Sequence, residues 1–308
     1  MGDLNERYRP NKDTEHRVTR YSWTGFVQTA AAKRKPHMTD SSRNNDLGYD
    51  WDLGADYAKA TELADDGWPE GAELVRKNLS AITAGMVTAP GLASTFDEEG
   101  ALPDVARYLD SEPDYWVRPV PAPTKRPGVR IVASVSASCG FGAEGMARRG
   151  CAIAILAEVL RMNGYSVSVE AQVAMFDCDS YPVPRNVNHV YAIEVMAPGE
   201  IMNINKIAFA LVHPAMFRRL GFSVREQHST PDYTVPMGYG YPSGYPGDCG
   251  PDDIFIPSMV WGEDINKRII DDPVGWIIEE AAKKGIVIER HGTIDKLEGL
   301  SKEPRGGR

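Results

Sequence analysis

The sequence predicts an α/β protein, with an open, mostly parallel β-sheet that carries helices on both faces and follows a smaller helical region. From Val129 onward, short runs rich in β-branched residues alternate with segments of helical periodicity, which is typical of a parallel sheet. The first two strands are joined by a helical segment over 142–165, long enough for the crossover that parallel strands require. The apolar fraction of 42% fits a packed core.

The first 46 residues are polar and interrupted by prolines, so we expect a flexible leader in which only the apolar stretch 21–26 docks on the rest of the protein. Residues 1–45 hold nine Lys or Arg against five acids, a net charge of +4. The whole chain carries −9, so the remainder carries −13. Such a basic leader could contact nucleic acid, although its interleaved acids equally fit a leader that is only solvated.

Residues 47–128 are expected to form a helical appendage and a Pro-rich linker. Apolar residues over 51–84 recur at helical intervals and predict two helices, with Gly67 ending the first and Pro69 opening the second. The Gly- and Pro-rich stretch that follows disfavours a helix and a central strand. Its short amphipathic piece 102–110 is expected to run along the surface of the next domain.

The α/β domain is expected over 129–291, with a flexible tail over 292–308. Strands are predicted at 129–135, 166–176, 188–196, 222–227, 253–257 and 286–290, and helices at 142–165, 204–219 and 272–285. The connection between the second and third strands is too short for a crossover helix, so these strands should pair antiparallel at one edge. Pro214 should interrupt the second helix.

The turn after the first strand reads RIVASVSASCGFGAEGMARRG over 130–150. The phosphate-binding motif G-x-x-x-x-G-K-[ST] is absent because the turn has no lysine, and the nucleophile motif G-x-S-x-G is absent too. GFGAEG over 140–145 has the G-x-G-x-x-G spacing of dinucleotide-binding turns. Asp177 and Asp179, the nearest candidates for the ribose-binding acid, stand over 30 residues on, where about 20 is usual. Nucleotide binding remains an alternative.

The alternating Ser134, Ser136 and Ser138, together with the order of strands and helices, resemble von Willebrand factor A-type domains. In that family the first strand ends in Asp-x-Ser-x-Ser, which holds a divalent cation, and Thr230 and Asp232 lie where a further ligand would be expected. Ser134 replaces the acid, so the resemblance implies at most a weakly bound cation such as magnesium, with Ser136, Ser138 and Asp232 as ligands. The alternative is that the serines only end a strand and cap a helix.

The stretches DDGWPEGA, MARRGCAIAILAEVLRMNGYSVSVE and NKIAFALVHPAMFRRLGF resemble uncharacterised proteins of tailed phages and other mobile elements. The resemblance implies a bacterial cytoplasm or a virion as the setting, and it implies no activity. The N-terminus lacks the apolar stretch of a signal peptide, no apolar run approaches the roughly 18 residues of a membrane span, and the four cysteines fit reduced thiols. We therefore expect a cytoplasmic protein with no membrane partner.

The loop 233–253 holds four tyrosines among glycines and prolines, a composition typical of binding loops and also of a long loop that packs its own side chains. We expect the domain to be a non-enzymatic interaction or assembly module that binds a protein partner where parallel strands end. The residues expected to contact this partner are Ser134, Thr230, Tyr239, Tyr241 and Tyr245.

An enzyme is the alternative to this interpretation. Asp177, Asp179 and Asp232 could hold metal ions for chemistry on nucleic acid that is bound by the basic leader, residues 1–45. His189, His213 and His228 could form a zinc site with Cys249, but no two of them lie at ligand spacing. No catalytic residue and no certain cofactor is assigned.

Overall fold

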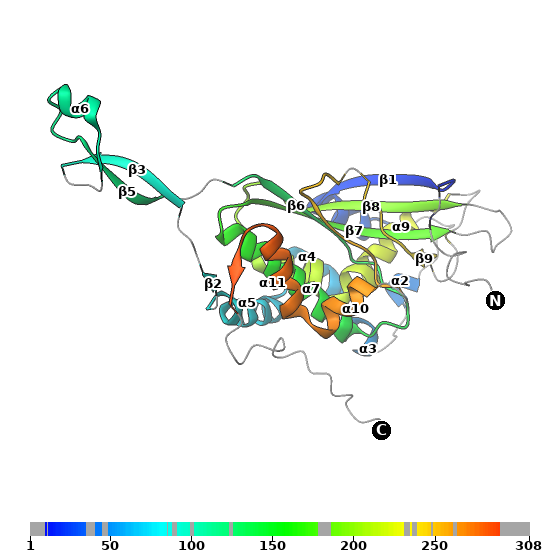
Figure 1. The fold of residues 1–308 in the computed structure, drawn as a ribbon. Helices are drawn as coiled ribbons and strands as arrows, with labels where there is room; N and C mark the ends of the chain where they lie inside the picture. Colours follow the sequence, from blue (N-terminus) through cyan, green and yellow to red (C-terminus); the bar gives the residue numbers. More distant parts are fainter. Residues whose placement is uncertain are drawn as a thin grey trace.

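In the computed structural model the described residues are 10, 12–34, 41–44, 49–84, 86–87, 91–98, 102–122, 126–177, 186–230, 235, 239–247, 249–260 and 264–289. They form one sheet, a thick layer of helices beneath it and a narrow ribbon that extends away from both (Figure 1).

The main sheet has six strands and is mixed but mostly parallel. Its path is β1 (Glu15–Ser22), β8 (Val187–Met196), β7 (Ser166–Asp177), β6 (Gly128–Ser134) and β10 (Ile254–Ile256), with β9 (Tyr241–Pro242) paired to β7. Neighbouring strands are parallel except where β7 meets β8 and β9. The predicted open α/β sheet is confirmed, as is the antiparallel pair made by the second and third strands of the predicted domain.

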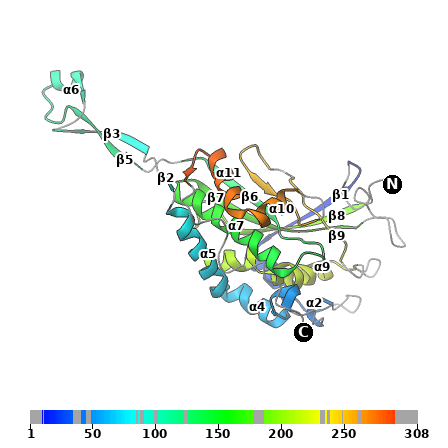
Figure 2. The same ribbon diagram turned by 60° about the horizontal axis from the view of Figure 1, so that its bottom comes forward.

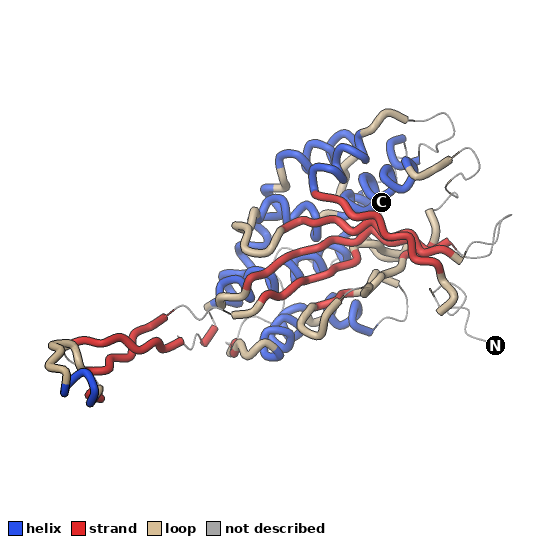
Figure 3. Tube along the Cα trace, turned by 90° about the horizontal axis from the view of Figure 1, so that it is seen from above, coloured by secondary structure: helices blue, strands red, loops and turns tan. Residues whose placement is uncertain are grey.

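The described helices of the body lie on one side of this sheet, whereas the sequence predicts helices on both. Val129, Ile131 and Ala133 point from β6 into the helix layer and are buried in the core. On the opposite face β6 presents Arg130 and Ser134. Figure 3 looks onto that face and shows the strands lying over the helices. Arg130 and Ser134, with the buried Val132 between them, therefore lie on a sheet face that no described helix covers.

The long helix predicted between the first two strands is α7 (Ala143–Met162), and every residue from Arg149 to Leu160 is buried. The sheet packs above it and α5 (Pro69–Thr83) contacts it from the outer helix layer (Figure 2). The predicted helical appendage is therefore part of the body. An aliphatic helix with no polar stripe needs neighbours all round, and the residues before β6 supply them.

The remaining helices of the body complete the layer. They are α1 (Trp23–Ala31), α2 (Ser41–Asn44), α3 (Tyr49–Asp52), α4 (Tyr57–Asp66), α8 (Ile204–Ile207), η2 (Ala208–Val212), η3 (Met216–Gly221), α9 (Phe222–Gln227), α10 (Asp264–Asp271) and α11 (Pro273–Lys283). Gly67 ends α4 with φ +83° and Pro69 opens α5, as predicted. The predicted strand at 286–290 is only β11 (Val287–Ile288), which pairs with β2 (Met86–Val87) outside the main sheet.

The segment after β8 contains one correct and one wrong prediction. The helical run is interrupted at His213, whose ψ of 122° is extended, as expected of the residue before Pro214. The predicted strand at 222–227 is instead helix α9. It continues directly from η3, and its residues from Ser223 to Gln227 are all buried. The strand beside β6 is β10.

The predicted flexible leader is wrong for residues 15–31. They form β1, the outermost strand of the sheet, and helix α1, whose N-cap Ser22 accepts a hydrogen bond from the Gly25 N–H. The apolar stretch 21–26 docks as expected, with Phe26 fully buried. An edge strand exposed on most of its length carries polar side chains, so its sequence does not look like a core strand.

The predicted Pro-rich linker contains a small antiparallel sheet, which we call the arm. It consists of β3 (Gly91–Asp97), β4 (Leu102–Pro103), helix α6 (Val105–Leu109) and β5 (Trp116–Ala122). Pro119 and Pro121 are tolerated because β4 pairs with β5 only at its first two residues, so one edge of β5 is unpaired there. The 102–110 piece lies on this arm and not on the body (Figure 1).

Candidate binding groove beside the tyrosine loop

Strands β6 and β7 stop pairing with each other at the carboxyl end of β6. β6 pairs with β7 as far as Gln172, and beyond it β9 pairs with the same edge of β7 at Met175 and Phe176. The sheet is therefore split at this point, between the end of β6 and the loop that carries β9. Backbone N–H and C=O groups at such a split need hydrogen-bond partners that strand pairing no longer supplies.

The predicted serines supply those partners. Ser136 Oγ accepts a hydrogen bond from Ala174 N at 2.8 Å, and Ser134 Oγ donates to Ser243 O at 2.9 Å. Both serines are fully buried. Ser138 is half-buried in the turn before α7, where its N–H donates to Met259 O at 2.9 Å. Two of the three alternating serines thus hold the split sheet together.

The loop over 239–247, which we call the tyrosine loop, is fixed to the helix-free face by side chains of the sheet. Their hydrogen bonds take the place of the backbone pairing that a neighbouring strand would make. The Gln172 side chain donates to Tyr245 O at 3.0 Å and accepts from Tyr245 N at 3.2 Å. Ser243 Oγ donates to Asn188 Oδ1 at 2.6 Å, and the Asn188 amide contacts His16 Nδ1 at 3.2 Å. The loop is held from three strands and keeps a defined shape.

A groove of about 480 Å³ lies between the tyrosine loop and the chain that follows β10. Its lining is mostly rings, prolines and small residues, and it is made by Pro10, His16, Pro242, Ser243, Gly244, Tyr245, Pro246, Gly247, Phe255, Pro257, Ser258 and Val260. The His16 and Tyr245 rings lie 4.6 Å apart. Burial lowers the pKa of His16, which favours the neutral ring. An aromatic, uncharged groove of this kind suits an apolar or extended segment.

A side chain at position 244, where the loop passes Phe255 of β10, would have to displace the Phe255 ring. A Cβ on Gly244 would lie 2.8 Å from the Phe255 ring. The loop and the strand approach each other closely here and close one side of the groove, so Gly244 helps to set the shape of the groove.

The other predicted contact residues are spread over two places. Tyr245 lines the groove and Tyr241, 39% exposed, lies on the same loop. Tyr239 is buried elsewhere, stacked on Phe222 at 3.9 Å and donating to Glu226 Oε1 at 2.6 Å. Thr230 is exposed, and Asp232 lies outside the described residues, as does Asp179. The weak magnesium site at Ser136, Ser138 and Asp232 therefore stays a prediction.

The sequence also missed a buried group of charges, because 222–227 was expected to be a strand. Arg225 of α9 is fully buried and its Nη2 lies 2.6 Å from Asp177 Oδ2. His189 Nε2 lies 3.5 Å from the same oxygen, and burial lowers the pKa of this imidazole. Asp177 is thus held in an ion pair with arginine.

Of the other two histidines considered for a zinc site, His213 is buried and His228 is half-buried. His213 Nδ1 accepts from the Ala215 N–H at 3.1 Å, and burial lowers its pKa to about 4. His228 Nε2 lies 3.0 Å from the Tyr21 hydroxyl. Within the described part of the chain, no three His, Cys, Asp or Glu side chains come together in a way that could hold a metal ion.

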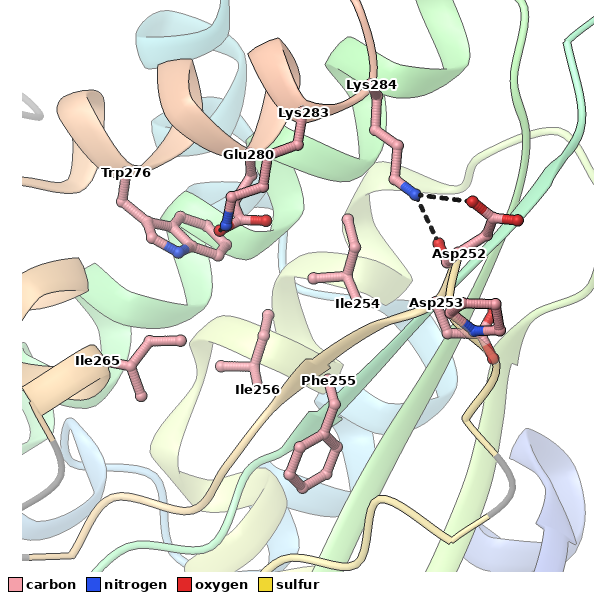
Figure 4. Close-up of a pocket in the computed structure, with 11 residues that line it drawn as sticks. Asp252, Asp253, Ile254, Phe255, Ile256, Ile265, Trp276, Glu280, Lys283 and Lys284 are labelled. Carbon is pink, nitrogen blue, oxygen red and sulfur yellow. Dashed lines mark hydrogen bonds and ion pairs between the residues drawn. The ribbon is translucent and has the colours of Figure 1, made fainter.

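A second pocket, of about 450 Å³, lies between β10 and α11 on the helix side of the sheet (Figure 4). Its charged side chains are already paired. Lys284 Nζ donates to Asp252 O at 2.8 Å, and Lys283 Nζ lies 2.6 Å from Glu280 Oε1. A ligand here would have to compete with these pairs, whereas the groove beside the tyrosine loop has no charged lining. We therefore take the groove as the candidate site.

Replacing Ser136 by alanine is expected to destabilise the protein by about 1–3 kcal/mol, because the buried Ala174 N–H would lose its acceptor. Urea unfolding measures the change. The matched control is Ser138→Ala, expected to cost less than about 0.5 kcal/mol because Ser138 is only half-buried. Equal costs for the two variants would contradict the assigned role of Ser136.

These features define an α/β protein with a one-sided, split sheet and a groove formed by a fixed loop. A family model described as a domain of unknown function, DUF7192, matches residues 9–286. The chain belongs to this family. The matched range contains both the arm and the groove. No curated protein and no solved structure matches the chain significantly.

Proposed function

We propose that this protein is a non-enzymatic interaction or assembly module that holds a segment of a protein partner in the groove beside the tyrosine loop. The observation that carries the proposal is the groove itself. It is aromatic and uncharged, and its loop is pinned by Ser134, Gln172 and Asn188 through hydrogen bonds that use buried polar side chains. A loop held this firmly loses little conformational entropy when a partner binds.

The setting we propose is a phage or mobile element acting in the bacterial cytoplasm or as part of a virion. The resemblance of three long stretches to phage proteins supports it. Among the described helices, none combines the length and the apolar character needed to cross a bilayer. Likeness to von Willebrand A-type domains belongs to the same proposal. The succession β6, α7, β7 and an antiparallel β8 supports it, whereas the further parallel strand expected at 222–227 is helix α9.

Site-specific photo-crosslinking tests the proposed function. A photoreactive phenylalanine analogue replaces Tyr245 in the groove, and the protein is irradiated in lysates of host cells with and without phage infection. We expect specific adducts whose crosslinked peptides, mapped by mass spectrometry, come from a small set of proteins. Tyr245→Ala is expected to weaken binding of a protein captured in this way by about tenfold or more.

The control places the same analogue at Tyr241, which is on the same loop but does not line the groove. It should give few or none of these adducts. If position 245 yields no adduct with any protein, or only those obtained from position 241, the groove is not a partner site and the proposed function is wrong.

A further inference from the structure

The tip of the arm has an ordered shape of its own. Asp104 caps α6 by accepting from the Arg107 N–H at 3.1 Å. Arg107 Nε donates to Asp114 O at 3.0 Å, and the Tyr108 and Tyr115 rings lie 5.0 Å apart. The tip is therefore held together by local contacts rather than by the body.

This tip presents apolar side chains to solvent. Val105, Tyr108 and Leu109 are 65%, 58% and 74% exposed. Positions i, i+3 and i+4 fall on one face of a helix, which is how a helix inserts its anchors into a partner's groove. Three large apolar side chains on one short helix form a common apolar face, unlike the scattered exposure of single apolar residues that is common on surfaces.

The arm and the groove are at opposite ends of the molecule. The arm joins the body at the amino end of β6, whereas the groove lies beyond the carboxyl end of β10, which is parallel to β6. Figure 1 shows the arm extending from one end of the sheet and β9, on the tyrosine loop, toward the other end. The apolar face of the tip therefore lies far from the groove of the same molecule.

The arm and the N-terminal segment carry opposite charge. Residues 91–122 of the arm hold seven acids and two arginines, a net charge of −5. The described residues 12–34 and 41–44, which contribute His16 to the groove and form the edge strand β1, hold six basic residues and two acids, a net charge of +4. Opposite charges on the arm and on this segment favour a head-to-tail encounter between copies.

We propose that the arm of one copy of this chain docks in the groove of a second copy, with Tyr108 and Leu109 entering beside Tyr245. This inference rests on the proposed function and identifies the partner as a second copy of the same chain. The contact is head-to-tail, so each dimer keeps one unused arm at one end and one unused groove at the other. Repetition of the contact builds a ring or a filament.

Analytical ultracentrifugation of the full chain over a range of concentrations tests the proposal. Wild type is expected to form dimers and larger species, and association should weaken as salt rises because the arm and the N-terminal segment attract each other electrostatically. Tyr108→Ser with Leu109→Ser in the arm, or Tyr245→Ala in the groove, should each weaken association about tenfold or more. Both changes are at exposed or groove-lining positions, and circular dichroism verifies that the variants fold.

The decisive sample is an equimolar mixture of the arm variant and the groove variant. Each retains the half that the other lacks, so the mixture should form a heterodimer and nothing larger. Ile201→Ser is the matched control, because Ile201 is an apolar side chain, 88% exposed, that belongs neither to the arm nor to the groove lining, and this variant should associate like wild type. Monomers of wild type at every concentration, or no heterodimer in the mixture, would overturn the inference.

The crosslink at position 245 separates this inference from the proposed function. Adducts with a peptide of the arm from a second copy support both. Adducts with a different protein alone overturn the self-docking inference and leave the groove as a partner site. An assembly lost in the arm variant but unchanged in Tyr245→Ala also overturns the inference, since the arm would then dock elsewhere.

Discussion

Replacing Asp52 by alanine is expected to lower the free energy of unfolding by about 3–5 kcal/mol, because it leaves the buried Arg219 guanidinium without its counterion. The side chains of Asp52 and Arg219 are only 3% and 4% exposed. Arg219 Nε and Nη2 donate to Asp52 Oδ2 at 2.9 and 2.5 Å, and Asp52 Oδ1 accepts from the Gly54 N–H at 3.0 Å. Urea unfolding monitored by circular dichroism measures the loss.

Two comparisons make this result specific. Glu62→Ala breaks the exposed Lys59–Glu62 pair and should cost less than about 1 kcal/mol. The double variant Asp52→Ala with Arg219→Met removes both buried charges and should be more stable than Asp52→Ala alone. If Asp52→Ala costs no more than Glu62→Ala, the ion pair does not tie α3 to η3 as the structure indicates.

Replacing Gly150 by alanine is expected to destabilise the protein by about 3 kcal/mol or more, because helix α7 meets η2 with no room for a side chain. A Cβ on Gly150 would lie 1.9 Å from Leu211 O and 2.6 Å from Val212 Cα, both backbone atoms. The two elements would have to move apart, and this would open the core around α7. Thermal unfolding measures the effect.

The control is Gly145→Ala on the same helix. The nearest atoms to a Cβ there are side-chain carbons of Ile270 and Met259, both at 3.9 Å. Alanine is a better helix former than glycine, so Gly145→Ala should be neutral or stabilising by up to about 1 kcal/mol. Equal effects of the two substitutions would show that the close contact with η2 does not set the role of Gly150.

Local signals in the sequence predicted much of the body. The long aliphatic run of α7, the break at Pro214 and the short link that forces β7 and β8 antiparallel all depend on neighbouring residues. Such features are encoded by periodicity, by backbone restriction or by the length of a connection. For this reason the fold class was predicted correctly.

Two elements were read wrongly because contacts distant in sequence decide them. FSVREQ alternates like a strand, yet it is helix α9, since η3 leads into it and α1 packs against it. β1 looks like a solvated leader because its charged side chains belong to an exposed edge, and only its register with β8 makes it a strand. A pattern of period two can arise by chance in a segment that tertiary contacts bury on every side.

The candidate site shows the same division. The sequence identified the serine turn and the tyrosine-rich loop, since alternating hydroxyls and rings among glycines are visible locally. It did not identify His16, Gln172 or Asn188, although a polar residue at an inward position of an apolar strand is a signal that could have pointed to the last two. Their roles appear only when four segments meet at one end of the sheet.

By itself the sequence determined which segments form the central strands and helix α7, because those choices depend on side-chain pattern within a few residues. Only the tertiary structure decided that the helices of the described body cover one face, that the serine hydroxyls bond across a split between β6 and β7, and that the Pro-rich region forms an arm. These outcomes follow from the pairing of hydrogen-bonding groups and surfaces far apart in the chain, whose free energy no single segment carries.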